Sequence, residues 1–123
     1  MKKIFNDIRC LSEFEKDLKK LSRKFRSLDD DLENFINTAL NLRHKLNIDN
    51  NSIVQISNLG IESPKVFKAR KFACKALKGK GAMSGIRVIY AYYEEKDVIE
   101  FIEIYYKTDQ ANENRERIES HYK

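Results

Sequence analysis

The sequence predicts an α+β domain in which a helical hairpin packs on one face of a small antiparallel or mixed sheet. Two observations predict it. Apolar side chains recur at helical spacing only in residues 12–46, whereas the long segments rich in Ile, Val, Tyr and Phe come after residue 64. Helices and strands are therefore segregated along the chain, which is typical of the α+β class. The length of 123 residues predicts a single domain, 1–123.

The N-terminal half is expected to contain one strand followed by two helices. Residues 3–10 indicate a short strand. A helix begins at Ser12, where "SEFE" has the form of a capping box, and its apolar stripe consists of Phe14, Leu18, Leu21 and Phe25. "SLDD" repeats the start signal at Ser27, and a second stripe runs to Leu46. The short connection between the two stripes predicts an antiparallel helical hairpin.

The C-terminal half is expected to supply most of the sheet. Residues 47–52 have the composition of a loop, and residues 53–63 are ambiguous. Residues 65–75 indicate a strand, and the glycine-rich "KGKGAMSG" leads to two further strands, "IRVIYAYY" and "VIEFIEIYYK", joined by the turn "EEKD". The polar residues from Asp109 onward form either a C-terminal helix or a frayed tail. The predicted order is β-α-α-β-β-β, with this optional helix at the end.

Positive charge is concentrated in one part of the chain. Residues 65–93 contain eight Lys and Arg and no Asp or Glu, so the rest of the chain carries a net charge of −3 within a total of +5. Such a local surplus of positive charge favours binding to a polyanion or to an acidic partner. Lys68 and Arg70 are two apart on a strand and should share a face, and Arg87 begins the next strand, so the three could converge. The candidate phosphate contacts around them are Lys65, Lys71, Lys75, Lys78 and Lys80.

The pairing of the last two strands has two alternatives. If Tyr93 pairs with Val98, Arg87 shares a face with Ile102, Ile104 and Tyr106. If Glu94 pairs with Val98, Arg87 lies beside Glu103, Tyr105 and Lys107. Only the second alternative brings the carboxylate of Glu103 into the cationic site. The helices cover one sheet face, and the other face is expected to stay open to solvent.

Several classes of protein are disfavoured by composition. No apolar run approaches the roughly 20 residues needed to cross a bilayer, and the N-terminus lacks the features of a signal peptide. Cys10 and Cys74 are too few for a disulfide framework, and no Cys/His spacing suggests zinc. His44 is expected to be exposed on the second helix, and His121 lies in the tail. We therefore expect a cytoplasmic protein without metal or cofactor.

The order of these segments resembles a known family. The first strand, the hairpin from "SEFEKDLKKLSRKF", then "VFKARKF", "SGIRVIYAYYEEKDVIEFIEIYYK" and a polar C-terminal segment are similar to RelE/ParE-superfamily toxins of type II toxin–antitoxin systems, in particular the RelE-like mRNA interferase branch. The resemblance implies a metal-independent endoribonuclease that cuts mRNA on the ribosome and inhibits translation. It also implies a cognate antitoxin, a second polypeptide that covers the basic face or displaces the C-terminal helix.

The resemblance also assigns roles to residues. Lys68 and Arg70 match the paired basic strand residues, with a lysine of lowered pKa as base, and Arg87 matches the phosphate-stabilising arginine after "SG". The chain departs from the family where Thr108 follows Lys107, because members carry an Arg there and a Tyr shortly after. Lys107 or the RNA-contacting Tyr106 would then act in their place, or Glu103 would be the base. The alternatives are a ParE-like gyrase-inhibiting toxin and a non-catalytic RNA- or ribosome-binding decayed toxin.

Overall fold

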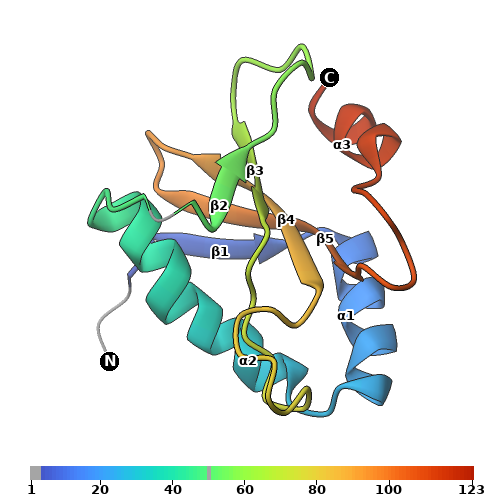
Figure 1. Ribbon diagram of the computed structural model, residues 1–123. Helices are drawn as coiled ribbons and strands as arrows, with labels where there is room; N and C mark the ends of the chain where they lie inside the picture. The colour runs from blue at the N-terminus through green and yellow to red at the C-terminus, as the bar shows by residue number, and fades with distance from the viewer. Residues whose placement is uncertain (1–3, 50) are drawn as a thin grey trace.

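A five-stranded mixed sheet forms the centre of the part of the chain that the computed structural model describes, residues 4–49 and 51–123 (Figure 1). Its strand order is β1-β5-β4-β3-β2, with β1 parallel to β5 and every other neighbouring pair antiparallel. The strands are β1 (Asp7–Cys10), β2 (Ile53–Gln55), β3 (Lys65–Ala69), β4 (Ile86–Tyr93) and β5 (Val98–Tyr106). The helices are α1 (Ser12–Lys24), α2 (Leu28–Phe35), the π-helical segment η1 (Ile36–Lys45) and α3 (Arg115–Tyr122). This arrangement confirms the predicted α+β class.

The helical hairpin covers one face of the sheet, as predicted. In Figure 1 α1 and α2 meet at their short connection and diverge from it, with η1 continuing the line of α2. Phe14 of α1 is fully buried and stacks on Phe101 of β5, with ring centroids 5.0 Å apart. Phe35 of α2 and Leu40 of η1 belong to the same buried cluster. The apolar stripes therefore produce the main core between the helices and the sheet.

Neither predicted capping box forms. Ser12 is the first residue of α1 rather than its N-cap, and its hydroxyl bonds to Glu13. The Ser27 hydroxyl donates to the buried Asp31 carboxylate, 2.6 Å away, and accepts from the backbone N–H of Ala76. The backbone N–H of Lys75 donates to the same carboxylate. These polar groups therefore hold the 70–82 segment against α2 instead of capping a helix.

The strand predicted over residues 65–75 is wrong beyond Ala69. The backbone of Phe72 bonds instead to Ala82 and to the Ser84 hydroxyl, and Lys75 is bound to α2, so this segment leaves the sheet. The ambiguous region supplies an unexpected edge strand, β2. The first strand begins at Asp7, later than expected, and residue 3 lies outside the described residues.

The expectation of an open second face is wrong for much of that face. A second buried cluster lies there, in which Ile118 of α3 and Leu59 pack with Val66, Ile89 and Ile102. α3 reaches this face through residues 107–114, which return along the sheet after β5 (Figure 1). The polar C-terminal segment is therefore an ordered cover with one fully buried apolar anchor.

The β4–β5 pairing combines the two predicted alternatives. Tyr93 pairs with Val98 at the turn, as in the first alternative. A β-bulge then shifts the register between Ile89 and Tyr90, so that Ile89 faces Glu103 and Arg87 faces Tyr105, as in the second. One extra residue therefore brings Glu103 to the face that carries Arg87.

His44 is not exposed as expected but packs in an aromatic group. Its ring lies 4.8 Å from that of Phe67 and 4.5 Å from that of Tyr92, centroid to centroid. Its Nε2 lies 2.6 Å from the hydroxyl of Tyr90, a side chain that is fully buried. η1 carries His44 toward the sheet, so the imidazole closes one end of the main core.

Candidate nucleic-acid interface

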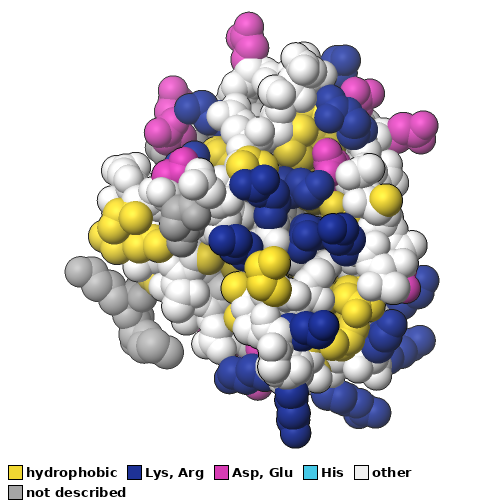
Figure 2. All heavy atoms as spheres, in the orientation of Figure 1, with side chains coloured by type: hydrophobic (Ala, Val, Ile, Leu, Met, Phe, Trp, Pro, Cys, Tyr) yellow, Lys and Arg dark blue, Asp and Glu magenta, His cyan; other side chains and the backbone are white. Residues whose placement is uncertain are grey.

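Two cations share the sheet face opposite the helical hairpin. In the strand register, Lys68 of β3 lies opposite Ile89, and Arg87 lies two residues before Ile89 on β4. Long side chains in such diagonal positions can reach a common ligand. Figure 2 shows Lys and Arg side chains gathered over the region of β3 and β4, with Asp and Glu mostly toward the upper part of the view. We call Lys68, Arg87, Glu103 and Tyr105 the cationic site.

Lys68 is paired with a carboxylate from the C-terminal segment. Its Nζ lies 2.9 Å from Oε1 of Glu113, and only 18% and 14% of the two side chains are exposed. Burial lowers the pKa of Lys68, but the hydrogen bond to Glu113, together with neighbouring Tyr105, outweighs it and raises that pKa. The expected lowering of the lysine pKa by neighbouring cations is therefore wrong in this state. Burial likewise raises the pKa of Glu113, and the bond from Lys68 outweighs it and lowers that pKa.

Glu103 is buried and holds the C-terminal segment at two points. Its Oε1 accepts from the backbone N–H of Asn114 and its Oε2 accepts from the side-chain amide of Gln110, both at 2.8 Å. Only 2% of Glu103 is exposed. Both oxygens of the candidate base are thus occupied while residues 110–114 stay in place.

The Tyr105 hydroxyl is buried in the same site. Tyr105 lies opposite Arg87 in the strand register and is 4% exposed. Its hydroxyl lies close enough to the Lys68 ammonium to affect the pKa of both groups, and its proton has no acceptor among the described residues. Burial raises the pKa of Tyr105, against the opposing positive charge of the nearby Lys68. The hydroxyl therefore remains protonated at neutral pH and is available as a donor.

Arg87 and Arg70 differ in their surroundings. Arg87 is half-buried, and within residues 4–49 and 51–123 it forms no ion pair. Arg70 follows the end of β3 and is exposed, and its Nη2 donates to the backbone oxygen of Asn51, 2.7 Å away. Arg70 is thus engaged at the β2 edge of the sheet, whereas Arg87 is available to an anion.

The other candidate residues are dispersed. Lys65 pairs at 3.6 Å with Glu94 beside the β4–β5 turn, and Lys107 is exposed in the turn that follows β5. Tyr106 lies on the helix-covered side, where its ring meets that of Phe25 at 5.0 Å. The remaining predicted phosphate contacts are exposed on the 70–82 segment: Lys71, Lys75, Lys78 and Lys80. The structure therefore places Lys68, Arg87 and Glu103 on one sheet face and leaves the others at the periphery or on the opposite face.

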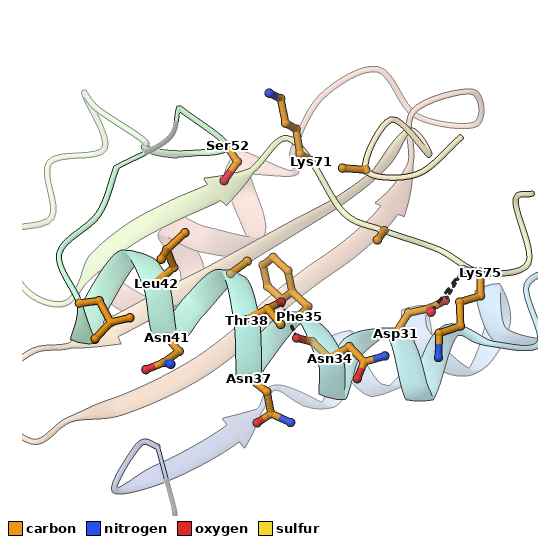
Figure 3. Close-up of a pocket in the computed structure, with 14 residues that line it drawn as sticks. Asp31, Asn34, Phe35, Asn37, Thr38, Asn41, Leu42, Ser52, Lys71 and Lys75 are labelled. Atoms are coloured by element: carbon orange, nitrogen blue, oxygen red, sulfur yellow. Dashed lines mark hydrogen bonds between the residues drawn. The ribbon is translucent and has the colours of Figure 1, made fainter. Parts of the chain in front are cut away.

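A cavity of about 530 Å³ lies apart from the cationic site. Figure 3 shows Phe35, Thr38 and Leu42 on its helical wall, with Lys71 and Lys75 coming from the 70–82 segment. None of the four residues of the cationic site lines it. The cavity therefore adds no group to the chemistry proposed for that site.

The described residues contain neither a cluster suited to a metal ion nor a helix that could span a membrane. They contain no group of three or more His, Cys, Asp or Glu arranged to hold a metal ion. In the described part of the chain, every helix is too short or too polar to traverse a lipid bilayer.

Glu113 and Gln110 are the functional candidates that sequence patterns did not single out. The Glu113–Lys68 contact joins residues 45 positions apart, and the Gln110–Glu103 bond depends on how the chain returns after β5. No motif marks either contact.

Comparison with known proteins gives one distant structural likeness. No family model matches this sequence, and no match is found among curated proteins. The chain is similar to a chain in the crystal structure of the archaeal RelE–RelB complex from Pyrococcus horikoshii OT3, with 14% sequence identity and a TM-score of 0.47. The likeness covers 80% of this chain and 90% of the other. That complex bears the name of the family that the sequence resembles, but a likeness at this level carries no argument about activity or partner.

Proposed function

We propose that this chain is the toxin of a type II toxin–antitoxin pair and cleaves mRNA on the ribosome without a metal ion. The observation that supports it is the shared face of Lys68 and Arg87, with a buried carboxylate, Glu103, on the same face. Two cations beside one carboxylate suit a reaction in which a phosphodiester gains charge in its transition state. The order of the sequence motifs, which resembles that of RelE-like toxins, indicates the family.

The reaction is an internal transfer at phosphorus. The 2′-oxygen of one nucleotide forms a bond to the adjacent phosphorus while the bond to the 5′-oxygen breaks, which leaves a 2′,3′-cyclic phosphate and a 5′-hydroxyl. A base must take the 2′-hydroxyl proton, and the 5′-oxygen must receive a proton. Arg87 is suited to hold two phosphate oxygens through its planar fork. Lys68 with its raised pKa supplies fixed positive charge, and Glu103 is the candidate base once its hydrogen-bond donors withdraw.

A second candidate function is RNA binding without cleavage. It is favoured by the occupied state of both Glu103 oxygens and by the raised pKa of Lys68, which leave this site without a free base. Thr108, where the family carries Arg, also removes one cation from the expected set. In either version the antitoxin is a second polypeptide with an acidic or amphipathic segment, since such a segment would neutralise the cationic site.

The test is inducible expression in a bacterial host of the wild type, Arg87→Ala and Lys16→Ala, with growth curves and mapping of mRNA 5′-ends. Lys16 is an exposed cation on α1 and controls for the loss of one charge. We expect growth arrest and mRNA cuts inside translated frames for the wild type and for Lys16→Ala. Arg87→Ala should show neither the arrest nor the cuts. Arrest without cuts would point to a protein target such as gyrase. Salt-dependent RNA binding by purified protein without arrest would establish the non-catalytic alternative.

A further inference from the structure

The C-terminal segment occupies the cationic site with one of its own carboxylates. Residues 107–114 connect β5 to α3, and Glu113 enters the site from this connection. The carboxylate of Glu113 lies against Lys68 in a largely buried position, at 2.9 Å. A carboxylate and a phosphate offer a lysine the same kind of partner, an anionic oxygen that accepts a charge-assisted hydrogen bond.

Two groups of the site are not used by Glu113. The buried Tyr105 hydroxyl lies beside the Lys68 ammonium, but its proton has no acceptor in the described part of the chain, and Arg87 has no ion-pair partner there. A buried hydroxyl proton without an acceptor is costly, so a native structure that retains one calls for a physical explanation. Both groups share a sheet face with Lys68, and a phosphate has more acceptor oxygens than a carboxylate. The site therefore has more donors than its present occupant can satisfy.

We infer that Lys68, Tyr105 and Arg87 form a phosphate-binding position for RNA, which Glu113 fills in the free protein. This inference rests on the proposed function and extends it. RNA enters when the Glu113 side chain turns away, and a phosphate oxygen then replaces the carboxylate on Lys68 and accepts from the Tyr105 hydroxyl. Glu113 is thus a competitor within the chain, and RNA affinity includes the cost of displacing it.

α3 itself does not have to leave for this exchange. Glu113 precedes the first residue of α3, and the helix is fixed independently through fully buried Ile118. Arg117 also donates to Asp17 of α1, at 2.7 Å, and the Tyr122 hydroxyl donates to Glu100 of β5. A rotation of one side chain is a smaller change than release of a helix held at three points. The structure therefore favours Glu113 as the moving part.

The experiment measures binding of a fluorescent 12-nucleotide oligouridylate to the full chain at several salt concentrations. Glu113→Gln keeps the shape of the side chain and removes its charge, and Glu116→Gln is the matched control, because Glu116 is exposed on the first turn of α3. Loss of a charge-assisted competitor is expected to tighten binding about ten-fold in Glu113→Gln. The control should tighten it less than about two-fold, since it changes only the long-range field.

Two further variants tie the effect to this position. When Lys68 is replaced by Met, Glu113→Gln should no longer tighten RNA binding, because Glu113 then has no lysine for which to compete. Tyr105→Phe should weaken RNA binding with little change in thermal stability, because the hydroxyl proton has no acceptor to lose in the folded protein.

The outcomes separate the inference from the proposed function. Equal affinities of Glu113→Gln and Glu116→Gln, with RNA binding that is still weakened in Arg87→Ala, would overturn the inference and leave the proposed function standing. Unchanged binding in Tyr105→Phe would remove the hydroxyl from the site and overturn the three-group position. Absence of RNA binding in the wild type and in Glu113→Gln would overturn both.

Discussion

Mild acidification is expected to destabilise this protein through His44. The imidazole is held against the buried Tyr90 hydroxyl, with the cations Arg43 and Lys45 as its neighbours along η1. Burial, followed by the charges of Arg43 and Lys45, lowers the pKa of His44 from 6.5 to about 4. The folded protein therefore favours the neutral ring, whereas the unfolded chain binds the proton at its ordinary pKa.

The sign and the size of the effect follow from this difference. Because the folded-state pKa is the lower one, the stability that neutral His44 contributes is complete above pH 6.5 and is lost as the pH falls toward 4. The gap between the two pKa values corresponds to about 3.4 kcal/mol of differential proton binding. The ring is only partly buried, so solvent screening reduces this to roughly 1.5–2 kcal/mol. At pH 5, where part of the effect has developed, the expected loss is about 1 kcal/mol.

The assay is urea unfolding of the wild type, His44→Gln and His121→Gln at several pH values between 7.5 and 5. This window lies above the range in which carboxylates take up most of their protons. His121→Gln is the control, because His121 is exposed and faces Glu13 at 3.0 Å. The free energy of unfolding should fall with pH in the wild type and in the control, but much less in His44→Gln. An identical slope in all three proteins would refute the assignment of the effect to His44.

Two substitutions test the packing of α3 on the sheet and of the turn that precedes β4. Ile118→Ala should lower the free energy of unfolding by about 2–3 kcal/mol and speed amide exchange across α3, because Ile118 is fully buried beneath that helix; protection of α3 equal to wild type would contradict its anchoring role. Gly85→Ala should cost about 1–2 kcal/mol in urea unfolding, because φ is +85° there and the added Cβ would lie 3.3 Å from Cε1 of Tyr106. An alanine variant as stable as the wild type would show that this turn relaxes freely.

The elements with strong local patterns could be predicted from the sequence. The strands "IRVIYAYY" and "VIEFIEIYYK" and the helix starting at Ser12 were predicted close to their observed bounds, β4, β5 and α1. β-Branched and aromatic residues occupy nearly every position of the two strands, and both faces of those strands are buried. The apolar stripe of α1 similarly packs against a single surface. In these segments local propensity and tertiary packing favour the same structure.

The remaining features depend on contacts between distant residues. The strand after Lys65 stops at Ala69 because its continuation is bound by Asp31, a residue of α2. The bulge at Ile89 cannot be seen in a pattern of alternate residues, because an extra residue changes which face each side chain occupies. The cover over the second face depends on Ile118 and on a few polar bonds spread through a charged segment.

The β-bulge affects the cationic site through Glu103, which it brings to the face that carries Arg87. If the two hydrogen bonds of Glu103 hold residues 110–114 in place, Glu103→Gln should weaken the segment, since an amide can accept at only one of its two terminal atoms. The loss should be about 1–2 kcal/mol in local stability, measured as faster amide exchange between Gln110 and Asn114. Glu100→Gln is the matched control on the same strand, because the Tyr122 hydroxyl that donates to Glu100 can still bond to an amide oxygen. Unchanged amide exchange in Glu103→Gln would mean that α3, rather than the Glu103 carboxylate, keeps Glu113 in contact with Lys68.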